Sequence, residues 1–124
     1  MPDTPISMCR PRDSLPKAEL KKPFATLLDS RDPEWSDAVF LSSKSAELFD
    51  MGCRYYVCFG PRAEFVHDSI DDEILKKISE EDCTTTFHDD EAAEDVATFF
   101  QVVAMRGMTH GLLLVNDSDW LAKL

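Results

Sequence analysis

The chain has 124 residues, 44% of them hydrophobic and 30% charged, and its formal net charge at pH 7 is −11. These values are typical of one globular domain. No apolar run approaches the roughly 18 residues of a membrane span, and the proline-rich segment from Met1 to Pro16 lacks the apolar core of a signal peptide. We therefore expect a cytoplasmic protein.

Residues 1–22 are expected to form a flexible arm ahead of a single α/β domain at residues 23–124. Four prolines interrupt the arm, and polar residues fill the gaps between them. The arm also carries basic residues that could either lie against the acidic second half of the chain or stay mobile: Arg10, Arg12, Lys17, Lys21 and Lys22.

Short apolar runs then alternate with helix-periodic runs. The apolar runs predict strands at residues 24–28, 54–59 and 112–115, and the β-branched and aromatic residues at 84–87 predict another strand. Short, continuous apolar strands are typical of a parallel sheet that is covered on both faces. We therefore expect three layers, with a four-stranded, mainly parallel sheet in the order βαβαβαβ and helices on both faces.

The expected helices lie between these strands. Asp32 should cap the first helix, Ser69 the second, and Asp89 or Asp90 the third. Gly52 and Gly107 should end the first and third helices. The apolar stripe of the second helix includes Ile78. The residues expected in the core are Leu27, Val57, Phe87, Phe99, Phe100, Val103, Leu113 and Val115.

The net negative charge of the chain comes entirely from its second half. Residues 1–62 carry nine basic and nine acidic side chains, whereas residues 63–124 carry four and fifteen. Such a field repels nucleic acid and anionic membranes and attracts cations or basic protein surfaces. We expect neither nucleic acid nor membrane as a partner, although acidic residues of this kind also aid solubility.

Polar residues follow each predicted strand. Because the carboxyl ends of parallel strands meet at one edge of a sheet, this edge should collect the strand-following segments. α/β proteins usually bind their ligands there. The segments are Asp29, Gly60 with the loop from Glu64 to Asp68, the run from His88 to Glu91, and the run from Asn116 to Asp119.

Two His-Asp pairs, His67-Asp68 and His88-Asp89, fall within these segments. Such pairs can perform general acid–base chemistry or hold a divalent metal such as Mg²⁺ or Mn²⁺. Each histidine could equally satisfy neighbouring polar groups or face water. An enzyme would use His67, His88 and Asp89 in catalysis, with Asp68, His88 and Asp89 as metal ligands. No glycine-rich phosphate loop and no G-x-S-x-G motif accompanies them.

The four cysteines, Cys9, Cys53, Cys58 and Cys83, show no metal-binding spacing. In a cytoplasmic chain they are expected to be reduced and buried rather than paired in disulfides. Cys58 could pair with His67, but a buried strand cysteine is the simpler interpretation.

Three motifs between Arg54 and Asp95 resemble a poorly characterised family of small bacterial α/β proteins. They are Tyr55-x-x-Cys58-x-Gly60, His67-Asp68-x-x-Asp71, and Thr85-Thr86-Phe87-His88-Asp89-Asp90-Glu91. The resemblance implies that the acidic and histidine residues of the last two motifs share a site, and it implies no established activity. In size and acidity, though not in motif, the chain is also similar to immunity proteins and antitoxins.

Two functions are consistent with these features. The first is an acidic protein-binding module, an immunity or antitoxin protein that covers the active-site cleft of a basic, nuclease-type toxin. The second is a small metal-dependent hydrolase or phosphoryl-transfer enzyme. The excess of acids and the missing phosphate loop favour the first, for which no cofactor is expected. Its partner-binding residues would be Asp68, Asp71, Asp72, Asp89, Asp90, Glu91 and Glu94.

Overall fold

A computed structural model describes residues 4–77 and 82–124 of the chain, so Ile78 lies outside the described residues. Its centre is a five-stranded sheet in the order β1-β5-β2-β3-β4, in which every neighbouring pair is parallel. The strands are β1 (Ile6–Cys9), β2 (Phe24–Asp29), β3 (Cys53–Phe59), β4 (Thr84–His88) and β5 (His110–Leu114).

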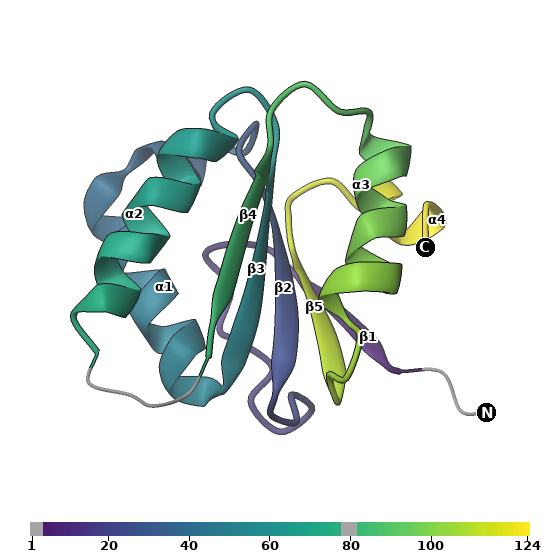
Figure 1. Cartoon of the computed structure of the whole chain (residues 1–124), viewed down its shortest axis with the longest axis horizontal. Coiled ribbons are helices and arrows are strands. Elements are labelled where there is room, and N and C mark those ends of the chain that lie inside the picture. Colours follow the sequence, from purple (N-terminus) through teal and green to yellow (C-terminus); the bar gives the residue numbers. More distant parts are fainter. Residues whose placement is uncertain (1–3, 78–81) are drawn as a thin grey trace.

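Helices cover both faces of this sheet (Figure 1). On one face lie η1 (Pro33–Ser36), α1 (Ala38–Met51) and α2 (Ala63–Leu75), and on the other lie α3 (Ala93–Phe99), η2 (Phe100–Ala104) and α4 (Asp119–Ala122). The expected three-layer α/β architecture with a parallel sheet is therefore confirmed. Within the described residues, no helix is long and apolar enough to cross a membrane.

Two hydrophobic cores result from the alternation of side chains along each strand. Leu28, Tyr56 and Leu112 pack under α1 and α2, whereas their neighbours Leu27, Val57 and Leu113 pack under α3 and α4. The central strands β2 and β5 are buried on both faces. This explains why their sequences are continuously apolar rather than alternating.

The predicted strand number is wrong, because the sheet has five strands instead of four. The additional strand β1 lies in the segment expected to be an irregular arm, and it pairs with β5 from Ile6 opposite Gly111 to Cys9 opposite Leu114. The side chain of Ser7 also lies 2.8 Å from Nε2 of the buried His110. Strand β5, about one hundred residues away in the sequence, therefore stabilises β1. The local sequence of β1 is too short and too rich in proline to predict a strand by itself.

Three predicted helix starts also need correction. Asp32 precedes the short helix η1, without a capping hydrogen bond from its side chain, and Asp37 caps α1 by accepting from the N–H groups of Val39 and Phe40. Helix α2 begins at Ala63 rather than after Ser69, since the chain turns at Gly60 and Pro61 directly into the helix. Helix α3 begins at Ala93, after an extended Ala92. Gly52 does end α1, in the left-handed conformation that favours glycine.

Most of the predicted core is buried, namely Leu27, Val57, Phe100, Leu113 and Val115, and Phe99 is partly buried. Two predictions are wrong. Phe87 is 38% exposed because β4 is an edge strand, and Val103 is 43% exposed. Residues 100–104 form a π-helical turn in which Met105 N–H donates to the Phe100 carbonyl. This wider turn directs Phe100 and Ala104 inward and Val103 outward.

Candidate functional site

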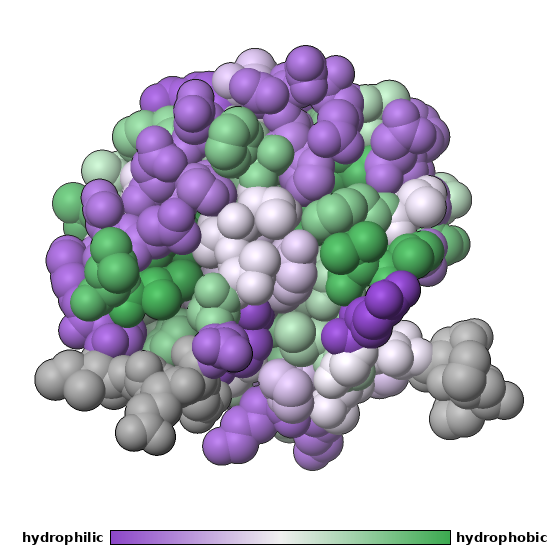
Figure 2. Space-filling view, in the orientation of Figure 1, coloured by the Kyte–Doolittle hydropathy of each residue, from purple (hydrophilic) through white to green (hydrophobic). Residues whose placement is uncertain are grey.

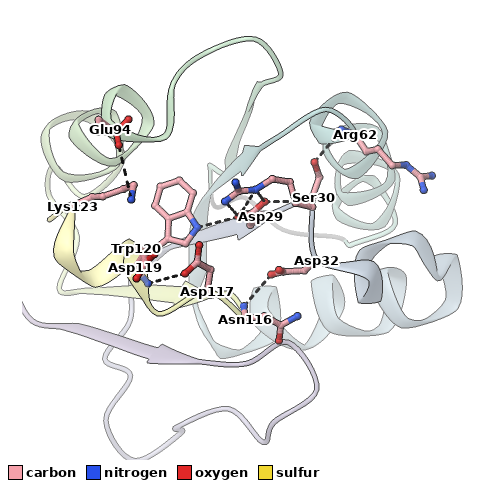
Figure 3. Close-up of polar contacts among 11 residues, drawn as sticks. Asp29, Ser30, Asp32, Arg62, Glu94, Asn116, Asp117, Asp119, Trp120 and Lys123 are labelled. Carbon is pink, nitrogen blue, oxygen red and sulfur yellow. Dashed lines mark hydrogen bonds and ion pairs between the residues drawn. The ribbon is translucent and has the colours of Figure 1, made fainter.

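The direction of the chain through the sheet reverses beside β2. From β2 to β3 to β4 the chain moves toward one edge with α1 and α2 on one face, and from β4 it returns to β5 with α3 on the other. The loops after β2 and β5 therefore diverge to opposite faces. In doubly wound sheets such a switch point is the usual ligand-binding position. Figure 3 shows that Asp29, Asp32, Asn116, Asp117 and Trp120 gather there.

Asp29, the last residue of β2, is only 1% exposed and is fully paired. Both its carboxylate oxygens accept hydrogen bonds from the Arg31 guanidinium, at 3.0 Å and 2.6 Å. Nε1 of Trp120 donates to the same carboxylate at 3.1 Å. These three donors neutralise and satisfy the buried charge. Asp29 therefore ties α4 to β2 and is not free to bind a ligand.

Asp32 joins the two loops of the switch point. Its Oδ2 accepts a hydrogen bond of 3.0 Å from the backbone N–H of Asn116, and the Asn116 amide donates to Glu34 at 2.9 Å. Burial, assisted by the charges of Asp29 and Glu34, raises the pKa of Asp32 to about 6. The Asp32 side chain thus holds the loops after β2 and β5 together.

Ser30 connects the same edge to β3. Its hydroxyl accepts a hydrogen bond of 3.0 Å from the Arg62 N–H at the start of α2. Gly60 permits this approach, because its φ is +106° and a Cβ there would lie 2.5 Å from the Ser30 hydroxyl oxygen. The side chains at the switch point are thus bonded mainly to one another. The edge expected from the sequence exists, and its central part has a structural role.

His88 ends β4 on the α3 side of the sheet. It is 7% exposed, its Nδ1 lies 3.0 Å from Oε1 of Glu91, and its Nε2 lies 3.0 Å from the hydroxyl of Thr86. Its ring packs against Phe99 with a centroid distance of 4.6 Å. Both ring nitrogens therefore have partners within the protein, while Asp89 and Asp90 point into solvent.

His67 lies on the opposite face. It is on α2 rather than in a loop, and its ring packs edge-on against Phe87, the residue before His88, at 5.0 Å. Its Nδ1 lies 2.9 Å from Asp68, and its Nε2 lies 3.5 Å from Asp71. Because successive residues of a strand face opposite sides, Phe87 and His88 direct the two histidines apart.

The residues expected for an enzyme consequently do not form one site. The sheet separates His67 and Asp68 from His88, so neither the proposed catalytic set nor the proposed metal set comes together. Among the residues that the structure describes, no group of three or more His, Cys, Asp or Glu is placed to hold a metal. Cys58 is buried, and burial raises the pKa of its thiol, which disfavours a nucleophilic thiolate.

The seven acids expected to bind a partner form two groups on either side of β4. Asp68, Asp71 and Asp72 lie on α2, and Asp89, Asp90, Glu91 and Glu94 lie in the β4–α3 connection and the first turn of α3. We call these seven residues, together with β4 between them, the acidic face. In the described part of the chain, Glu94 is the only one of the seven with a Lys or Arg ion pair, a 4.0 Å contact with Lys123.

Two basic residues of the N-terminal segment contact another part of the molecule rather than this face. Arg12 pairs with Asp37 and packs over Phe40, and Lys17 pairs with Glu47. All three contacts are on the α1 side of the molecule. The sequence left open whether these side chains would reach the acidic half, and the described contacts place Arg12 and Lys17 elsewhere.

Sequence reasoning missed two parts of this arrangement. The first is the pairing of Asp29 with Arg31, for which the only local signal is two opposite charges flanking one residue. The second is the position of β4 at the edge of the sheet. The polar Thr84-Thr85-Thr86 run was a signal for it, because a central strand of this sheet has apolar residues at such positions.

The reversed chain direction and the layers on both faces define a doubly wound α/β protein. A family model described as a domain of unknown function, DUF7684, matches residues 6–116, and the chain belongs to this family. Membership of a poorly characterised family is thereby confirmed. The match extends well beyond the stretch from Arg54 to Asp95 and includes β1. No curated protein and no solved structure matches the chain.

Proposed function

We propose that this chain is an acidic protein-binding module, and specifically a cytoplasmic immunity or antitoxin protein. It would neutralise a basic, nuclease-type toxin by covering the active-site cleft with its acidic face. The observation that carries the proposal is the charge of that face: seven acids flank one strand, and six of them have no described ion pair to a Lys or Arg.

Electrostatics supports this function in two ways. A cleft that holds nucleic acid is basic, so an acidic surface of similar extent is complementary to it and accelerates association. The acids of the face also repel one another, and a basic partner relieves that repulsion. The four free cysteines, two of them buried, are consistent with a reducing compartment.

The structure offers less support for an enzyme. His88 and Asp29 have their polar atoms occupied by protein partners. His67 and His88 lie on opposite faces of the sheet, and neither of them faces a group that it could activate beyond its own carboxylate partner. We therefore favour the binding function over hydrolysis or phosphoryl transfer.

The test uses the product of the gene adjacent to this one as the first candidate partner. We expect that protein to be basic, to stop growth when it is expressed alone, and to be neutralised by co-expression of this chain. Binding should be fast at low salt and should slow steeply as the ionic strength rises, because salt screens the exposed charges.

A charge reversal then locates the interface. Replacing Asp89 and Asp90 by lysine should weaken binding by several kcal/mol through like-charge contact. The matched control replaces Asp13 and Glu19 by lysine, which changes the net charge equally at two exposed positions of the N-terminal segment. Binding that ignores both salt and the reversal at Asp89 and Asp90 would contradict the proposal and would place the interface elsewhere, for example around the exposed Leu121 of α4.

A further inference from the structure

The strand inside the acidic face has an open edge. In the part of the chain that the structure describes, β4 pairs only with β3. The His88 carbonyl accepts a hydrogen bond of 3.1 Å from Gly60 N–H, so the backbone groups of His88 point toward β3. Since these groups alternate in direction along a parallel strand, the N–H and C=O of Thr85 and Phe87 point away from the sheet.

This edge lacks the features that normally prevent strand addition. Edge strands are commonly short, bulged, or protected by lysine and proline. The other edge strand, β1, has four residues and is bounded by Pro5 and by Arg10-Pro11. In contrast, β4 has five residues, carries no lysine or proline, and pairs with β3 in unbroken register from Thr84 to His88.

Exposed apolar side chains border the open edge on both sides. Phe87 is 38% exposed on the α2 side, where Leu75 in the last turn of α2 is 81% exposed. Val102 and Val103 are exposed on η2. Figure 2 shows a pale band over β4 between hydrophobic patches over α2 and over the α3 side, with hydrophilic residues above it. An added strand would place alternate side chains against the two patches.

The acidic residues around the β4 edge determine which kind of chain could add to it. A second copy of this chain would bring another set of the same acids against the first, and the two sets would repel each other. An extended segment with lysine or arginine would instead meet the α2 acids on one side and Asp89, Asp90 and Glu91 on the other. Strand addition also supplies backbone hydrogen bonds that need no particular side chains.

We propose that the free edge of β4 is the recognition element, and that an extended, basic segment of the partner protein adds to it as a sixth strand. The proposal rests on the proposed function and specifies how the acidic face binds. It requires the outward N–H and C=O groups of Thr85 and Phe87 as well as the acids.

Proline substitution tests the backbone contribution. Thr85→Pro removes an N–H that points outward, so it should leave the pairing of β4 with β3 intact. The matched control is Met8→Pro at the opposite edge. The carbonyls of Pro5 and Cys9 both accept from β5, so the alternation turns the N–H of Met8 outward as well. Circular dichroism and thermal melting establish that both variants fold.

The probe is a short peptide of alternating valine and lysine, compared with the same peptide N-methylated at every residue, so that neither of its backbone edges can donate. We expect the unmethylated peptide to bind the wild-type chain, and to bind Thr85→Pro at least about tenfold more weakly, with little change for Met8→Pro. Binding should slow the hydrogen exchange of the Thr85 and Phe87 amides.

The outcomes separate the two proposals. If Thr85→Pro binds as wild type does, or if a fully N-methylated peptide binds equally well, strand addition is wrong while a purely electrostatic acidic face stands. If no basic peptide binds, this inference is overturned, and the partner test above still decides the proposed function. A dimer of the wild-type chain that Thr85→Pro makes monomeric would show that a second copy occupies the edge instead.

Discussion

Trp120 donates a hydrogen bond of 3.1 Å to Asp29, and so joins the last helix of the chain to the carboxyl end of β2. The two residues are each 1% exposed, and the indole ring also packs edge-on against Phe59 of β3 at 5.1 Å. The four-residue helix α4 has little stability of its own. Its position therefore depends largely on this buried tryptophan.

Replacing Trp120 by phenylalanine should destabilise the fold, because it removes a donor from a buried carboxylate. The matched control is Trp35→Phe, since Trp35 is equally buried but its Nε1 has no hydrogen-bond partner among the described residues. We expect Trp120→Phe to lower the free energy of unfolding by about 1–3 kcal/mol more than Trp35→Phe. Urea denaturation followed by circular dichroism measures both, and equal losses would contradict the role of this hydrogen bond.

Asp32 should make the stability depend on pH. Burial raises its pKa from the ordinary 3.8 to about 6, so the folded state holds the proton more tightly than the unfolded state does. The contribution of Asp32 to the free energy of unfolding therefore falls as the pH rises from about 4 to about 6. Asp32→Asn keeps an acceptor for the Asn116 N–H. Because the amide does not ionise, this variant should not lose stability as the pH rises.

Relative to wild type, Asp32→Asn should thus gain about 1–3 kcal/mol of stability between about pH 4 and pH 7. The measurement is urea denaturation of both proteins across this range. Asp90→Asn, at an exposed position, controls for the loss of one negative charge. A difference between Asp32→Asn and wild type that does not change with pH would show that the carboxyl group titrates normally in the folded state.

Gly60 should tolerate a side chain less well than Gly107. Both have positive φ values, +106° and +76°, but a Cβ at Gly60 would meet the Ser30 hydroxyl whereas a Cβ at Gly107 has open space. Gly107→Ala should cost about 1 kcal/mol, from backbone strain alone. Gly60→Ala should cost more, because it also displaces the acceptor of the Arg62 N–H. Equal values in thermal or urea unfolding would mean that Ser30 moves aside freely.

The core and the edge strand should differ in their response to truncation. Phe100→Ala removes a fully buried ring from under β2 and β3 and should cost about 3–5 kcal/mol. Phe87→Ala removes a ring that is 38% exposed and should cost clearly less. A loss below about 1 kcal/mol for Phe100→Ala would place that ring outside the core.

The sequence was sufficient for the elements whose signals are local. Continuous apolar runs identified β2, β3 and β5, and Gly52 identified the end of α1. Helix starts were harder, because Asp32, Ser69 and Asp89 are all plausible caps and only tertiary packing decides which residues the helix uses. The π-helical turn that exposes Val103 has no recognisable local pattern.

The arrangement of the site could not be predicted, because it depends on the strand order and on where α2 begins. Whether β4 lies at the edge or in the middle depends on the direction of each crossover, and this direction decides whether Phe87 is buried. The separation of His67 from His88 follows from the start of α2 at Ala63, which turns the expected loop into a helix. The acids of the acidic face, in contrast, were identified from their charge and from their positions after predicted strands and at predicted helix starts, and their binding role stays a prediction.

The order of the strands also constrains how the chain is made. Strand β5 lies between β1 and β2, with Gly111 opposite Ile6 on one side and Ala25 on the other, yet it emerges from the ribosome after the other four strands of the sheet. Strands β1 and β2 therefore cannot be joined until β5 has been made. Until then, their apolar side chains are accessible to chaperones and proteases. A nascent chain that stalls before His110 cannot close the sheet, so the sheet can be completed only once β5 has been synthesised.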